Sequence, residues 1–157
     1  MRLNSKLARK NFLFLWLNNK EFYAIEAAKR GVDVAQVYVQ VPTILRAVRR
    51  IQIELKIPFV SLWMSSWKNK LKNYDVVIIH SSKITVPVVK YIKRKKPGVR
   101  VIVWYWNPVD KSVPSSSYSD TICEKWSFDE GDCKKYGLHY NTQYYFNDIP
   151  LPNNKIE

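Results

Sequence analysis

Apolar runs and amphipathic stretches alternate along this chain, and the alternation predicts strands separated by helices. Strands are expected where short runs rich in apolar residues occur, at 11–17, 34–41, 57–64, 75–79, 100–106, 122–127 and 140–146. Helices are expected where apolar residues recur at helical spacing, at 21–30, 42–55, 85–96 and 129–137. This order is typical of βαβ units. We therefore expect an α/β fold, a single Rossmann-like domain with a mostly parallel sheet flanked by helices.

The predicted domain spans residues 1–146, and residues 147–157 form a linker rich in Pro and Asn. We expect the linker to lead to a C-terminal domain that this chain lacks. The 157 residues, of which 46% are hydrophobic, are enough for one domain with its own core. The two cysteines make neither a disulfide framework nor a metal site, so we expect reduced thiols in a cytoplasmic protein.

The predicted helix at 42–55 is strongly amphipathic. Its apolar stripe consists of Leu45, Val48, Ile51 (or Gln52) and Leu55. Its opposite face carries Arg46, Arg49 and Arg50.

Positive charge is concentrated in the first two thirds of the chain. The net charge is +13, and residues 1–109 hold 21 of the 26 Lys and Arg residues but 5 of the 13 acidic ones. Such a field attracts nucleic acid, anionic lipid headgroups or phosphate-bearing substrates, although a solubilising surface is the simpler alternative. The side chains expected to form a surface for a membrane or another anion are Arg46, Arg49, Arg50, Lys93 and Lys96.

Ligands of open α/β sheets bind outside the carboxyl ends of the strands, so the residues at those ends are the candidate site. They are Asn18, Asn19, His80, Ser81, Ser82, Trp106, Asn107 and Asp129. His80 is the candidate catalytic residue, acting as a general base, and the others are candidate substrate-binding residues. Structural alternatives stay open, since His80 can bond to backbone, Ser81 and Ser82 can cap a helix, and Asp129 can cap with Asp132 as its capping-box partner.

The sequence lacks the glycine-rich motifs of common nucleotide-binding sites. The chain has only 4 Gly residues, and their spacing forms neither a G-x-G-x-x-G fingerprint nor a phosphate-binding P-loop. A dinucleotide or nucleoside triphosphate site of those kinds is therefore not expected. The sequence offers no metal-ligand cluster and predicts no cofactor in this chain.

Three segments carry a resemblance to a known family: YDVVIIHSS at 74–82, WYWNP at 104–108 and WSFDEGDCKKYGL at 126–138. Together they resemble bacterial glycosyltransferases of polysaccharide biosynthesis, in the group related to the spore-maturation CgeB-like proteins. The resemblance is to the N-terminal half of a two-domain GT-B fold. It implies that this half binds the acceptor, while the C-terminal half binds the nucleotide-sugar donor and the reaction occurs between them.

The resemblance thus implies an acceptor-binding domain for cell-surface polysaccharide synthesis, inactive without a donor domain. The expected partners are a glycan or lipid-phosphate-linked acceptor, an anionic membrane surface at the inner face, and a C-terminal domain. The nucleotide-sugar is the only cofactor-like ligand expected, on that other domain. The alternative is a non-enzymatic basic α/β module that binds nucleic acid or a partner protein.

Overall fold

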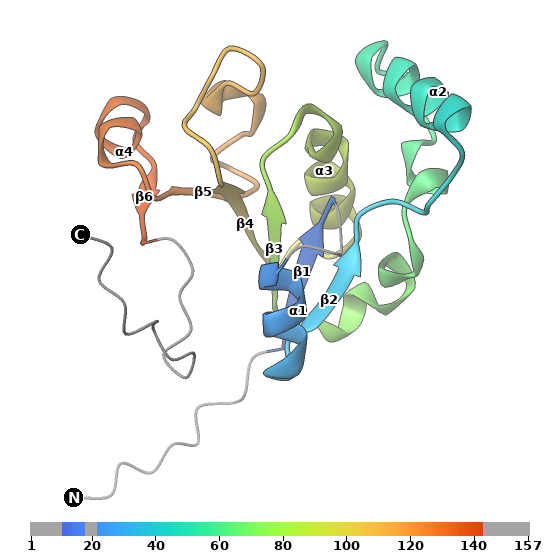
Figure 1. Ribbon diagram of the computed structural model, residues 1–157, viewed down its shortest axis with the longest axis horizontal. Coiled ribbons are helices and arrows are strands. Elements are labelled where there is room, and N and C mark those ends of the chain that lie inside the picture. The colour runs from blue at the N-terminus through green and yellow to red at the C-terminus, as the bar shows by residue number, and fades with distance from the viewer. Residues whose placement is uncertain (1–10, 18–21, 143–157) are drawn as a thin grey trace, which may run out of the picture.

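Six parallel strands form the centre of the computed structural model, which describes residues 11–17 and 22–142 (Figure 1). The strands are β1 (Phe12–Trp16), β2 (Asp33–Gln36), β3 (Val76–His80), β4 (Arg100–Tyr105), β5 (Glu124–Ser127) and β6 (His139–Tyr140). The α-helices are α1 (Phe22–Lys29), α2 (Thr43–Glu54), α3 (Val86–Lys95) and α4 (Glu130–Tyr136). Short 3₁₀ helices form at η1 (Val60–Trp63), η2 (Ser66–Asn73), η3 (Lys83–Thr85) and η4 (Ser115–Ser117). The predicted α/β, Rossmann-like fold is confirmed.

The strand order is β2-β1-β3-β4-β5-β6, and every neighbouring pair is parallel. From β1 the chain moves outward to β2 and then returns past β1 to form β3. The direction of winding therefore reverses between β1 and β3, where such folds usually bind ligands beyond the strand ends. Trp16 and His80 are the last residues of these two strands.

The central strands are buried on both faces, as parallel sheets require. In β4 the residues from Val101 to Tyr105 are all buried, and Val77 and Ile79 of β3 are fully enclosed. Helix α3 covers this part of the sheet with Val88, Val89 and Ile92. This packing explains why 75–79 and 100–106 read as continuous apolar runs rather than as alternating ones.

Two strand predictions differ from the structure. Residues 57–64 form η1 and its approach, because Pro58 is followed by Phe59 in the left-handed region at φ 68°. The strand expected over 34–41 ends at Gln36. After the amide of Val37 donates to the carbonyl of Trp16, the chain leaves the sheet, and Tyr38 makes an isolated antiparallel bridge to Met64.

The last predicted strand is confirmed only at its start, since β6 spans His139–Tyr140. Residues 143–146 and the linker expected at 147–157 lie outside the described residues, so the domain boundary stays a prediction.

A buried hydroxyl joins the loop between β4 and β5 to the turn after β3. The Tyr118 hydroxyl accepts from the amide of Ser82 at 2.9 Å and donates to the carbonyl of Ser82 at 2.8 Å. It also lies 2.7 Å from the hydroxyl of Thr85. This cluster fixes the backbone that follows His80.

We predict that Tyr118→Phe lowers the free energy of unfolding by about 1–3 kcal/mol, because the Ser82 amide loses its buried acceptor. Urea denaturation followed by circular dichroism measures the change. Tyr91→Phe is the control, since the Tyr91 hydroxyl makes no hydrogen bond within the described part of the chain. Equal losses in the two variants would contradict the role given to the Tyr118 hydroxyl.

Candidate functional site

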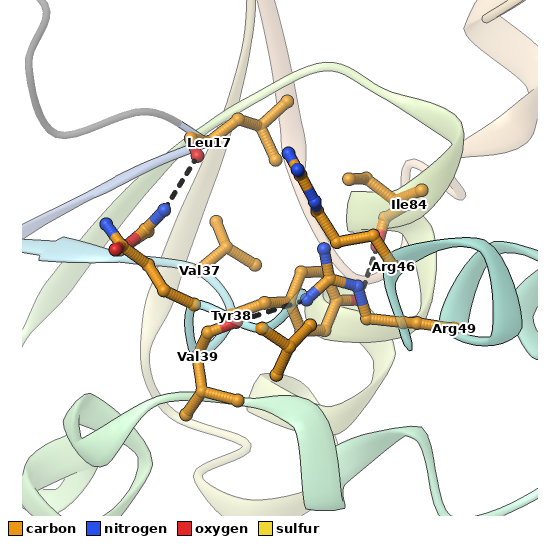
Figure 2. A pocket seen from close by; sticks show the side chains of 10 residues that line it. Leu17, Val37, Tyr38, Val39, Arg46, Arg49 and Ile84 are labelled. Carbon is orange, nitrogen blue, oxygen red and sulfur yellow. Dashed lines mark hydrogen bonds between the residues drawn. The ribbon is translucent and has the colours of Figure 1, made fainter. Parts of the chain in front are cut away.

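A pocket of about 480 Å³ opens at the carboxyl edge of the sheet (Figure 2). Its walls come from Leu17 after β1, the segment 36–41 at the end of β2, helix α2, and Ile84 in η3 after β3. The lining residues are Leu17, Gln36, Val37, Tyr38, Val39, Gln40, Val41, Arg46, Arg49 and Ile84. The pocket thus lies beside the point where the winding of the sheet reverses, because the segments that follow β1 and β3 both contribute to it.

Arg49 is the main charged group of this pocket. It is only 9% exposed, and its guanidinium lies 4.5 Å from the centre of the Tyr38 ring, within reach of a cation–π interaction. Its Nη1 donates to the carbonyl of Val39 at 3.4 Å, whereas its buried Nε has no hydrogen-bond partner. Burial is the main effect that lowers the pKa of Arg49, but a guanidinium remains charged.

Arg46 reaches the same space from the preceding turn of α2, as Figure 2 shows. Its Nη2 donates to the hydroxyl of Thr43 at 2.8 Å. Among the residues that the structure describes, no carboxylate forms an ion pair with either Arg46 or Arg49. Two guanidiniums in one pocket offer planar donors that suit a phosphate or carboxylate group.

The pocket walls are held by hydrogen bonds of their own. The Tyr38 hydroxyl donates to the carbonyl of Ile84 at 2.6 Å, which ties the segment after β2 to η3. Burial raises the pKa of Tyr38, so this hydroxyl stays protonated at neutral pH. The side-chain amide of Gln36 donates to the carbonyl of Leu17 at 3.3 Å. The two arginines of α2 therefore face walls that these hydrogen bonds hold in place.

His80 lies outside this pocket, in an aromatic cluster at the end of β3. The centre of its ring is 4.2 Å from Trp16, approached edge-on, and 5.6 Å from Trp106. Its Nε2 is buried and has no hydrogen-bond partner among residues 11–17 and 22–142. Burial lowers the pKa of His80 to about 4. The imidazole is therefore neutral at pH 7 and only weakly basic.

The other predicted strand-end residues occupy different environments. Ser81 and Ser82 are half-buried, and neither caps α3, since Ser82 precedes η3 without a side-chain capping bond. Asn107 is exposed, while Trp106 contacts His80 as the shared sheet edge predicts. Asn18 and Asn19 lie outside the described residues.

Asp129 is the N-cap of α4, as its structural alternative predicted. Its Oδ1 accepts from the amide of Asp132 at 2.7 Å. The capping-box role of Asp132 is wrong, because its carboxylate instead accepts from the amide of Val109 at 2.5 Å. Gly137 closes the helix at φ 66°. The capping of α4 thus accounts for Asp129 and Gly137 without a role in ligand binding.

The predicted anion surface is divided among several environments. The Lys93 ammonium donates to the carbonyls of Pro97 at 2.9 Å and Val99 at 2.7 Å. The Lys96 ammonium donates to the carbonyls of Lys72 and Tyr74. Arg50 is exposed on α2, whereas Arg46 and Arg49 line the pocket. The five cations therefore do not form one continuous face.

Sequence reasoning missed the pocket itself, and with it Tyr38. The one available signal was the pair Arg46 and Arg49, three residues apart on a helix that has no acid in its first turn. The contact between Tyr38 and Ile84 joins residues 46 positions apart, and no local pattern predicts it.

Comparisons of the chain with protein-family models, curated proteins and solved structures gave no match. Within the described ranges, no three His, Cys, Asp or Glu side chains gather where they could hold a metal ion. No helix of the same ranges has the length and apolar character needed to cross a membrane. The function is therefore argued from the geometry of the pocket.

Proposed function

We propose that this chain is a ligand-binding α/β domain whose pocket takes the anionic group of its ligand, a phosphate or a carboxylate. One observation carries the proposal: the guanidinium of Arg49 is buried beside that of Arg46, and no carboxylate of the described chain pairs with them. A charge removed from water without a counter-ion destabilises a fold by several kcal/mol in general. An anionic ligand supplies that missing counter-ion.

We further propose that the ligand is the acceptor of a glycosyltransferase. The resemblance carried by residues 74–138 supports this interpretation, as does the position of the pocket at the carboxyl edge of the sheet. A lipid-phosphate-linked or acidic glycan acceptor carries the anionic group that the two arginines suit. Under this proposal the nucleotide-sugar binds a separate C-terminal domain. His80 remains the candidate general base, from the aromatic cluster outside the pocket.

The alternative of a nucleic-acid-binding module has less support. It depends on a continuous basic surface, and two of its five expected members, Lys93 and Lys96, bind backbone carbonyls of their own chain. Nucleic acid is recognised largely through many phosphate contacts, so such binding would weaken steeply with added salt.

The test is a titration of the ¹⁵N-labelled chain with glucose 1-phosphate, inorganic phosphate and glucose. The proposal predicts amide shifts around Gln36, Val39 and Arg49 with both phosphate-bearing probes, and none with glucose. Shifts of equal size with glucose, or no shifts at these residues, would overturn it. A separate titration with oligothymidine distinguishes the alternative, which predicts salt-sensitive shifts spread over the basic helices.

A further inference from the structure

An unusual share of the exposed apolar side chains lies in one stretch of the chain. Of the twelve large apolar residues that are exposed in the described ranges, nine fall between residues 39 and 62. Six of them define what we call the apolar face: Ile44, Val48, Ile51, Leu55, Phe59 and Leu62. Single exposed apolar residues are ordinary, but a contiguous group of this kind marks a contact surface.

Helix α2 presents the first four of these residues as one stripe. Their spacing of four, three and four positions puts them on the same side of a helix. Arg49 and Ile53, which are buried or partly buried, lie on the opposite side. A surface helix normally turns its apolar stripe toward the core, and α2 turns it toward solvent. Figure 1 shows α2 standing beyond the strand ends at one extremity of the domain.

The two remaining members are fixed next to this helix. Phe59 is 73% exposed and Leu62 is 75% exposed. The segment that carries them is tied to α2 through Gln52, whose Oε1 accepts from the indole of Trp63 at 2.6 Å and whose amide donates to the carbonyl of Pro58 at 2.5 Å. The face therefore extends from α2 across η1.

The charge around the apolar face identifies what can cover it. Residues 39–73 contain seven Lys and Arg residues, five of them outside the pocket, and a single acid, Glu54. A second copy of this chain would bring the same positive charges against these, which opposes pairing. An anionic lipid surface complements them, and each Lys or Arg near such a surface contributes about 1 kcal/mol to binding.

We infer that the apolar face docks on the surface of an anionic lipid bilayer. Its side chains enter the boundary between headgroups and acyl chains while the surrounding cations meet the lipid phosphates, as in helices that lie in the membrane plane. This inference goes beyond the pocket and does not depend on its ligand. It also differs from the sequence-based expectation, which assigned membrane contact to the arginine side of the same helix.

The experiment is flotation of the full chain with vesicles of phosphatidylcholine alone or mixed with phosphatidylglycerol. We expect binding only to the mixed vesicles. Ile51→Glu and Leu62→Glu should each weaken it about tenfold or more, because a charge replaces an exposed apolar side chain that the bilayer would bury. Ile25→Glu is the matched control, since Ile25 is 45% exposed on α1, away from the face, and its variant should bind as the unchanged chain does.

Circular dichroism verifies that each variant is folded. Because the two substitutions lie in separate elements, the test still stands if one of the variants misfolds. Binding that is equal to both kinds of vesicle, or that survives Ile51→Glu and Leu62→Glu, would overturn the inference. So would sedimentation velocity showing a dimer in solution that the same substitutions dissociate. Arg49→Met separates this inference from the proposed function, because it removes a pocket cation and leaves the apolar face intact.

Discussion

Replacing Arg49 by methionine is expected to weaken binding of glucose 1-phosphate about a hundredfold, since charge-assisted hydrogen bonds contribute about 1.5–3 kcal/mol each. The same substitution is expected to raise the free energy of unfolding of the empty protein by about 1 kcal/mol, because an apolar side chain replaces a desolvated charge. Methionine keeps the length and flexibility needed to fill the space beside Tyr38. Binding and stability thus change in opposite directions.

Isothermal titration calorimetry and urea denaturation measure these two effects. Arg50→Met is the matched control, because Arg50 is one position further along α2 and exposed, so its replacement should change neither quantity by much. A clear loss of stability in Arg49→Met would mean that the guanidinium serves the fold through Tyr38 and Val39. That result would contradict the proposed anion site.

Acidification from pH 7 to pH 4 is expected to destabilise the protein through His80 alone by up to about 3 kcal/mol. Burial lowers the pKa of His80 to about 4 in the folded protein, whereas the unfolded chain has the ordinary value near 6.5. Between these values the unfolded state binds a proton that the folded state does not. The stabilisation is therefore fully present above the unfolded value and is lost as the pH falls toward 4.

Unfolding free energies measured at several pH values in the unchanged chain and in His80→Phe isolate this effect. Phenylalanine keeps an aromatic ring between Trp16 and Trp106 but does not titrate. His139→Gln is the control, because His139 is exposed on β6 and its replacement should leave the pH dependence in place. Identical pH profiles in the unchanged chain and His80→Phe would show that the His80 ring is accessible to water.

The Arg100–Glu124 pair acts in a lower pH range and so does not obscure the His80 effect. The hydrogen bond from Arg100 is the main cause that lowers the pKa of Glu124 to about 2. The contribution of this pair to the free energy of unfolding is present above the ordinary pKa of a glutamate and is lost as the pH falls toward 2. The pair is partly exposed, which limits its contribution to about 1 kcal/mol or less.

Local sequence patterns predicted the sheet well, because each central strand is buried on both faces and reads as a short apolar run. They failed at residues 57–64, where Ile57, Phe59 and Leu62 are exposed although Met64 at the end of the run is buried. An apolar run indicates that its side chains will be buried or in contact, but not whether the partner is the core of the same domain or another surface. Pro58 was the local sign against a strand here, since proline disfavours a central strand.

The candidate site could be predicted only in part. The rule that ligands bind beyond the strand ends drew attention to the sheet edge where the structure brings His80 and Trp106 into contact, and their part in binding stays a prediction. Arg46 and Arg49 were expected to meet an anion, but on an open surface. Their enclosure depends on the departure of Tyr38 from the sheet and its bond to Ile84, which are long-range features of the fold.

That departure also affects how the domain behaves in a crowded solution. Strand β2 lies at the edge of the sheet and has only four residues, although valine recurs at 34, 37, 39 and 41, which is typical of a longer strand. A flat edge of that length would offer unpaired backbone groups to other chains and favour aggregation. Because the chain turns away after Gln36 and buries Val37 and Tyr38, most of this aggregation-prone segment is withheld from the edge.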